Sequence, residues 1–183
     1  MSPMRNAKIT QLLQAQALLV SFALGGCQPD TRSPNSGLAL EFPSREDFTG
    51  PADAMQVKCG TLDCHGQIGR NLRLYGTYGM RLDNANNPID PFVTSDDEYD
   101  ASYWSVTALE PEDMTRVLKG EASVIDLAFI RKPRGLEKHK GHQLMTKGDP
   151  LDRCLVGWVT GTPDPDSCMI AKMTGRPQPD GGT

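Results

Sequence analysis

The chain has 183 residues, of which 38% are hydrophobic and 23% are charged, and its formal net charge is −4. This length suits one domain with a modest core, and the mildly acidic balance without a basic stripe excludes a typical nucleic-acid-binding protein. The residues with distinctive chemistry are five cysteines, at positions 27, 59, 64, 154 and 168.

Residues 1–26 predict a lipoprotein signal peptide. Two cations precede a largely apolar stretch at 9–24, which is too short to cross about 30 Å of hydrocarbon. The sequence Leu-Gly-Gly-Cys27 then matches a lipobox, whose cysteine is diacylated and becomes the new N-terminus. We therefore expect a protein anchored at the cell envelope through lipid on Cys27. Gln28 after it favours the outer membrane, facing the periplasm. An ordinary cleaved signal with an incidental cysteine is the alternative.

Composition divides the rest of the chain into three parts. Residues 27–43 are polar and interrupted by proline and glycine, which predicts a flexible tether behind the lipid. Residues 44–172 carry the apolar periodicity of a folded domain. Residues 173–183 are rich in glycine and proline and predict a disordered tail.

The first helix of the domain is expected to begin near Ser44, with Asp47 three residues on as a capping partner. Pro51 suits a first helical turn, and the apolar residues that follow share one face with Cys59. The first cysteine of the domain is thus predicted to lie at the end of a short helix.

The central motif is Cys59-Gly-Thr-Leu-Asp-Cys64-His65-Gly66. Two cysteines followed at once by a histidine are what covalent haem attachment requires, because each thiol adds to one vinyl group and the next imidazole ligates the iron. His65 is then the proximal ligand. The usual spacer has two residues and this one has four, which Gly60 helps to accommodate. A short disulfide loop, or a zinc site completed by a later histidine, would use the same residues.

The remaining elements follow from local patterns. Residues 69–76 alternate polar and apolar side chains, which by itself suggests a short strand, and residues 83–100 predict a solvated acidic loop. Helices are expected over 110–120, over 124–130 and over 149–161, where proline, early acids and terminal glycines provide start and stop signals.

Export to an oxidising compartment implies that thiols are paired or chemically captured. With Cys27 taken by lipid, an even number remains. Either both pairs are disulfides, or Cys59 and Cys64 hold haem while Cys154 and Cys168 form a disulfide. A Pro-Asp-Pro turn before Cys168 would bring it back against Cys154.

Four segments in this order resemble the cytochrome-c-like domains of bacterial envelope lipoproteins. They are Cys59–Gly66, Leu72–Gly76, the stretch from Arg131 to His142, and the helix at 149–161 with its leucine and tryptophan. The resemblance covers most of the domain and implies a small helical fold with a haem used for electron transfer.

The resemblance also bears on the second axial ligand. His139 matches the family's histidine, Met145 lies where small cytochromes place a methionine, and His142 is less expected because it replaces a usual glycine. Arg70 and Arg73 are candidate partners for the haem propionates.

We therefore expect a mostly α, cytochrome-c-like domain behind a lipoprotein signal and a flexible tether. It would carry one covalent haem c and act as an electron carrier rather than a catalyst. Its expected partners are the membrane, through the lipid, and redox proteins that the sequence does not identify. The alternative is a haem-less, disulfide-stapled envelope lipoprotein that acts as a binding or structural module.

Overall fold

The computed structural model describes residues 37, 39–82 and 92–175. The predicted signal peptide, the predicted lipidation site Cys27, most of the predicted tether, part of the predicted acidic loop and the last residues of the tail lie outside this range. The described residues from Ala39 onward belong to one compact unit.

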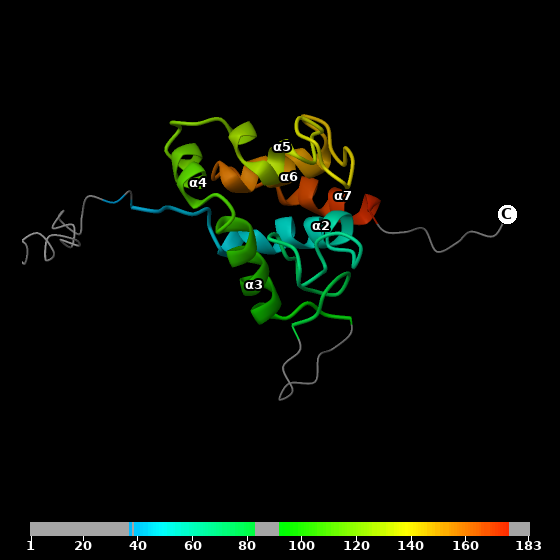
Figure 1. Cartoon of the computed structure of the whole chain (residues 1–183). Coiled ribbons are helices and arrows are strands. Elements are labelled where there is room, and N and C mark those ends of the chain that lie inside the picture. The colour runs from blue at the N-terminus through cyan, green and yellow to red at the C-terminus, as the bar shows by residue number, and fades with distance from the viewer. Residues whose placement is uncertain (1–36, 38, 83–91, 176–183) are drawn as a thin grey trace, which may run out of the picture. The chain divides into compact units, whose positions relative to one another are not determined.

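The described part of the chain is mostly α-helical, as expected, and it contains no strand (Figure 1). The central helix α2 packs against α3, α6 and α7. The elements are a 3-10 turn at Glu46–Phe48, α2 (Thr49–Cys59), α3 (Asp96–Thr107), α4 (Pro111–Leu118), a 3-10 turn at Val124–Asp126, α5 (Ala128–Arg131), α6 (Pro150–Val159) and α7 (Pro165–Thr174).

The helices expected at the start of the domain, over 110–120 and over 149–161 are confirmed, whereas the one expected over 124–130 is divided into a 3-10 turn at Val124–Asp126 and the short helix α5. The backbone N–H of Asp47 donates to the Ser44 hydroxyl (3.2 Å) at the entry to α2, and α2 ends at Cys59. Proline occupies the first position of both α4 and α6, and the Asp149 side chain caps α6.

The acidic loop predicted at 83–100 is wrong in its second half, because Asp96 begins helix α3. The Ser95 hydroxyl accepts the N–H of Glu98, and the Glu98 carboxylate accepts the N–H of Ser95, which is a capping box. Glu98 is also buried against Arg81, with 2.7 Å between Oε1 and Nε. The acids therefore stabilise a helix N-terminus.

The short strand suggested for 69–76 does not form either. Instead of a partner strand, the segment runs along α3, where the N–H groups of Arg73 and Tyr75 donate to the hydroxyls of Ser105 (2.7 Å) and Ser102 (2.9 Å). The alternation of side chains reflects this extended path, with one isolated bridge between Tyr75 and Met80.

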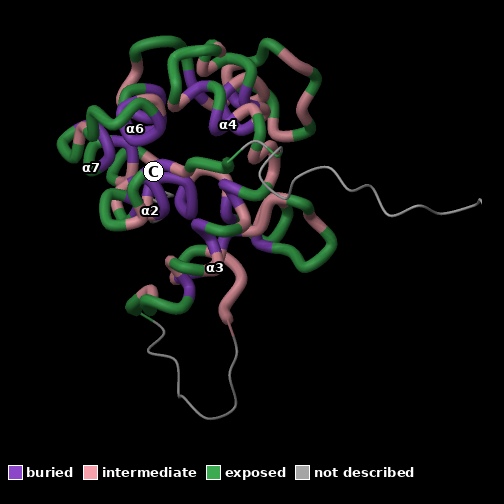
Figure 2. Tube along the Cα trace, turned by 90° about the vertical axis from the view of Figure 1, so that its left-hand side faces the viewer, coloured by how far each residue is buried: buried purple, intermediate pink, exposed green. Residues whose placement is uncertain are grey.

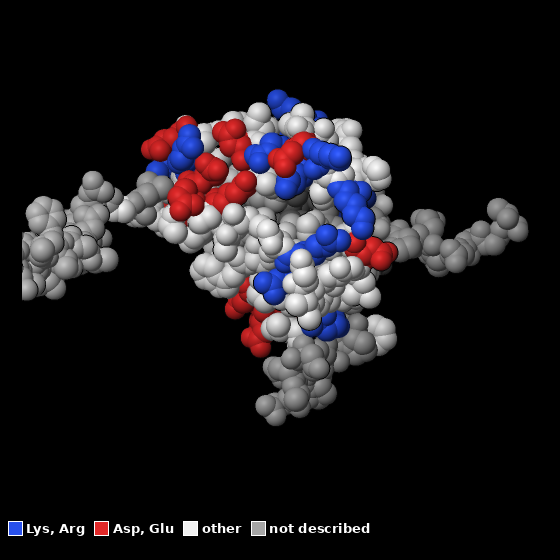
Figure 3. All heavy atoms as spheres, in the orientation of Figure 1, with Lys and Arg blue, Asp and Glu red and all other residues white. Residues whose placement is uncertain are grey.

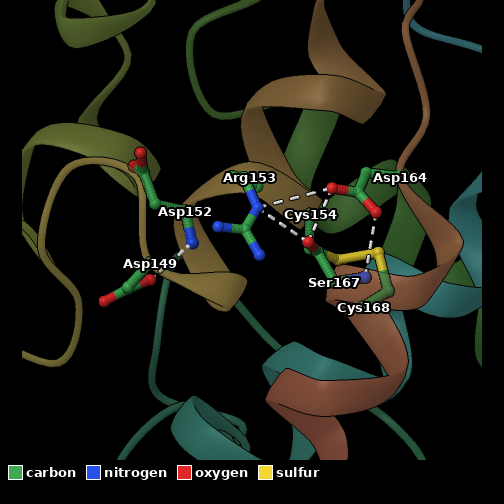
Figure 4. The surroundings of a disulfide bond; sticks show 7 residues. All are labelled: Asp149, Asp152, Arg153, Cys154, Asp164, Ser167 and Cys168. Atoms are coloured by element: carbon green, nitrogen blue, oxygen red, sulfur yellow. Dashed lines mark hydrogen bonds and ion pairs between the residues drawn. A yellow bond between two sulfur atoms is a disulfide. The ribbon is translucent and has the colours of Figure 1, made fainter.

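Helix α7 was not predicted from the sequence, which placed the last helix at 149–161. It follows α6 after a short connection. Asp164 caps α7 by accepting the N–H of Ser167 (2.9 Å), directly before Pro165. A disulfide joins Cys154 of α6 to Cys168 of α7, with 4.7 Å between Cα atoms (Figure 4). The expected pairing of these two cysteines is therefore present in the structure.

Every helix from α2 to α7 contributes buried residues to the core, and Figure 2 shows buried stretches on α2, α4 and α6. Trp158 is 1% exposed and its ring centre lies 4.8 Å from that of Phe48, while its indole N–H donates to the Ser44 carbonyl (2.8 Å). This core supports one side of α2 and of α6. The site described next uses the same two helices, and Met55, Leu151 and Leu155 belong both to this core and to the walls of the site.

Candidate functional site

The Cys59–His65 loop closes on itself directly after α2. The N–H of His65 donates to the carbonyl of Cys59 (2.9 Å), and the N–H of Cys64 donates to the carbonyl of Thr61 (2.9 Å). Of the four spacer residues, Gly60 is buried and the other three, 61–63, are exposed. The long spacer is therefore accommodated as a bulge into solvent, while the backbone of His65 stays directly against that of Cys59.

The imidazole of His65 is oriented by the segment that follows. Its Nδ1 lies 3.0 Å from the carbonyl oxygen of Leu72. Because a carbonyl only accepts, Nδ1–H is the donor and Nε2 keeps its lone pair. Metal-ligating histidines are commonly held in this way through their other nitrogen.

The electrostatic surroundings keep His65 neutral. Burial lowers its pKa and outweighs the hydrogen bond to Leu72, which raises the pKa. His139, Arg70 and Lys132 lower it further. His65 is therefore an unprotonated imidazole at neutral pH, which is the form that binds a metal.

His65 lines a cavity of about 370 Å³, within the usual size range of small-molecule and cofactor sites. Three helices supply apolar walls to it. The lining residues are Met55, Cys59, His65, Gly69, Arg70, Asn71, Leu72, Leu109, Ala128, Phe129, Lys132, Pro133, His139, Leu151 and Leu155.

Of the three candidate second ligands, His139 is the one that lines this cavity. Its ring centre lies 5.9 Å from that of His65, with the two planes 14° apart. Its Nδ1 is buried and has no hydrogen-bond partner among the described residues. His142 is exposed, and Met145, although only 2% exposed, is absent from the lining.

The two arginines predicted to contact haem propionates lie in different places. Arg70 lines the cavity and its Nε donates to the carbonyl of Cys64 (3.1 Å). Arg73 lies in a neighbouring groove beside Trp104. Lys132, which sequence reasoning did not select, supplies a second cation to the cavity. Basic side chains gather on the face between α5 and the segment after α2, whereas carboxylates gather over α4 (Figure 3).

Cys59 and Cys64 are free thiols in the structure, so the disulfide of the alternative interpretation is not formed. Cys59 lines the cavity and Cys64 does not. Burial, and then the neighbouring Cys64, raise the pKa of Cys59 to about 12, although Lys58 opposes the shift. Its thiol is therefore protonated at neutral pH.

A tetrahedral zinc site is not assembled in the described part of the chain, where no three side chains of His, Cys, Asp or Glu are grouped so that they could hold a metal ion. Among the described residues, the histidines that line this cavity are His65 and His139.

Leu72 belongs to the apolar lining of the cavity, whereas Leu74 and Trp158 are buried in the core and are absent from that lining. Leu151 and Leu155 lie four residues apart on α6, and Met55 and Cys59 are spaced in the same way on α2. This i, i+4 spacing is the sequence signal for a shared helical face.

Comparisons with other proteins add no assignment: the chain matches no protein-family model, no curated protein and no solved structure. Among the described residues, no helix has the length and apolar character needed to cross a membrane.

Proposed function

We propose that this protein is a membrane-anchored electron carrier that holds one haem covalently through Cys59 and Cys64, with His65 and His139 as the axial ligands. The observation that carries the proposal is that both imidazoles line the cavity that Cys59 also borders, with the His65 ring already oriented by the Leu72 carbonyl.

The residues present fit such a group. Two imidazoles that bind one metal ion from opposite sides would have ring centres about 6 Å apart, because two metal–nitrogen bonds of about 2 Å add to the distance of about 1.1 Å from each ring centre to its nitrogen. The observed separation of His65 and His139 is 5.9 Å. The porphyrin itself provides the other four iron ligands, so a cluster of three or more protein ligands is not needed.

The rest of the cavity supports the same proposal. Its helical walls present apolar side chains, such as Phe129 and Leu155, to a flat apolar ring system. Arg70 and Lys132 provide two cations for two carboxylates. The buried Nδ1 of His139 lacks a partner, as expected of a polar atom whose site is completed by a bound group.

Bound haem supplies one-electron exchange at the iron, and a second imidazole gives a lower potential than a thioether. In this proposal His65 and His139 would hold the iron, and the group would supply electron transfer rather than substrate turnover. The helical walls would shield the iron ligands from water on their side of the cavity. Cys59 and Cys64 prevent loss of the group.

The proposed location rests on the N-terminal sequence. The lipobox at Cys27 supports a lipid anchor at the outer membrane, facing the periplasm, with residues 28–43 as a tether. Redox partner proteins would reach the site in that compartment.

The test is the intact mass of the full chain, expressed together with c-type haem maturation proteins and then denatured. We expect the added mass of one haem. It should be absent from the double variant Cys59→Ala with Cys64→Ala and present in the matched double variant Cys154→Ser with Cys168→Ser. A wild-type chain without added mass would contradict the proposal and favour the haem-less envelope module.

A further inference from the structure

His139 lies on a segment between α5 and α6 that we name the His139 loop, residues 133–148. The base of this loop is closed by its own backbone, since the carbonyl of Pro133 accepts the N–H groups of Leu144 (2.9 Å) and Met145 (3.1 Å). Most residues between these points are exposed. The position of His139 therefore depends on how the ends of the loop are held.

One carboxylate on α6 holds both ends. Asp152 Oδ1 lies 2.6 Å from Nε and 2.6 Å from Nη2 of Arg134, at the start of the loop. Asp152 Oδ2 accepts the N–H of Gly148 (2.7 Å), at its end. The side chains of Arg134 and Asp152 are 8% and 5% exposed. This is a buried, hydrogen-bonded ion pair at the point where the loop meets the helix.

The same helix forms a wall of the cavity. Leu151 and Leu155, on either side of Asp152 in the sequence, line the cavity that His139 enters. A second attachment ties the loop to α5, through Glu137 and the Arg131 side chain (2.6 Å). That attachment is partly solvated, with the two side chains 31% and 38% exposed, and is expected to contribute less.

We propose that the Arg134–Asp152 pair is a positioning device that holds His139 opposite His65. It thereby selects an imidazole rather than the nearby Met145 as the second axial ligand. The selection of a ligand rests on the proposed function, whereas the restraint of the loop does not. Arg134 and Asp152 touch neither iron nor substrate and act only through His139.

Removing one partner would leave a buried charge unpaired and could unfold the domain, but replacing both by apolar residues of similar volume is often tolerated. The test variant is therefore Arg134→Met with Asp152→Leu. The matched control is Arg81→Met with Glu98→Leu, which removes another ion pair with a buried carboxylate, far along the chain on α3.

The first measurement uses trypsin on the full chain without haem, under native conditions. Lys138 and Lys140 are exposed on the His139 loop. We expect cleavage at these residues to rise about tenfold or more in the test variant, because a freed loop opens more often, and to stay unchanged in the control. Equal cleavage in the test variant and the wild type would overturn the proposal.

The second measurement uses carbon monoxide on the reduced, haem-loaded chain. We expect wild type to be six-coordinate and slow to bind carbon monoxide, and the test variant to bind it about tenfold faster or more, approaching His139→Ala. A test variant as slow as wild type would overturn the ligand-selecting role. A wild-type chain that takes up no haem would instead overturn the proposed function, and the trypsin result would still decide whether the pair restrains the loop.

Discussion

The imidazole rings of His65 and His139 lie 5.9 Å apart, centre to centre, with their planes 14° from parallel. The His65 ring is hydrogen-bonded through Nδ1 to the carbonyl of Leu72. The His139 ring belongs to a loop whose two ends both contact Asp152. Two imidazoles from distant parts of the sequence thus line one cavity, each held by its own local contacts.

Replacing His139 is expected to change the proposed iron site, whereas replacing His142 is not. His139 lines the cavity and His142 is exposed. In the haem-loaded chain, His139→Ala should lose the low-spin spectrum of a six-coordinate iron, and His142→Ala should keep it. The measurement is the absorption and electron paramagnetic resonance spectrum of the ferric protein. Loss of the low-spin signal in His142→Ala alone would contradict the assignment.

Gly66→Ala is expected to disrupt the Cys59–His65 loop. A Cβ at this position would lie 2.2 Å from the carbonyl oxygen of Gly60, so the loop could not close as it does. Gly69→Ala is the matched control, because a Cβ there meets nothing within 4 Å. We expect a lower urea midpoint in Gly66→Ala only. Equal behaviour of the two variants would show that the close approach to Gly60 is unimportant.

Removing the disulfide is expected to destabilise the domain by about 3 kcal/mol, because a crosslink over this sequence separation restricts the unfolded chain. Cys154 and Cys168 are 14 residues apart and join α6 to α7. The measurement is urea unfolding of Cys154→Ser with Cys168→Ser. A reductant should lower the midpoint of wild type toward that of the variant and leave the variant unchanged. If complete reduction of the disulfide left the urea midpoint of wild type unchanged, the prediction would be contradicted.

The fold was predictable from sequence where helix starts are marked by familiar signals. Pro111 and the Asp149-Pro150 pair located α4 and α6 correctly. Asp164-Pro165 carries the same signal for α7, but it was interpreted as a turn. Helix α3 was missed because its first turn is acidic, as solvated loops are, although Ser95 and Glu98 have capping-box spacing.

From the sequence alone, only those residues of the site that are neighbours in the chain could be placed together. His65 follows Cys64 directly, so its place near the cysteines needed no knowledge of the fold. The structure brings His139, and not Met145, into the lining of the cavity, and the His139 loop that carries both residues contacts α6 through Arg134 and Asp152. Such long-range contacts leave no local pattern, and the same is true of Lys132 at the cavity.

Glu98 is expected to make stability depend on pH. Burial raises its pKa, but hydrogen bonds from Arg81 and from the N–H groups of Ser95 and Leu82 outweigh this effect, so its pKa is lowered below 4.5. The folded state therefore holds the ionised carboxylate more strongly than the unfolded state. The resulting stabilisation is present above pH 4.5 and is lost as pH falls through the lowered pKa.

Glu98→Gln tests this prediction. At pH 7 it should be less stable than wild type by about 3 kcal/mol, because Arg81 loses its charged partner. The difference should shrink as pH falls below 4.5, where the carboxylate of wild type becomes protonated. The measurement is urea unfolding at several pH values between neutral and acid. A difference that is constant with pH would contradict the assigned role of the carboxylate.

The most direct test of the central claim is a pyridine haemochrome spectrum of the full chain after expression with c-type maturation proteins. We predict the spectrum of a haem whose two vinyl groups are both saturated by thioether bonds, shifted toward that of a single attachment in Cys64→Ala. A colourless wild-type chain, with Cys59 and Cys64 joined to each other and reactive only after reduction, would contradict the haem proposal.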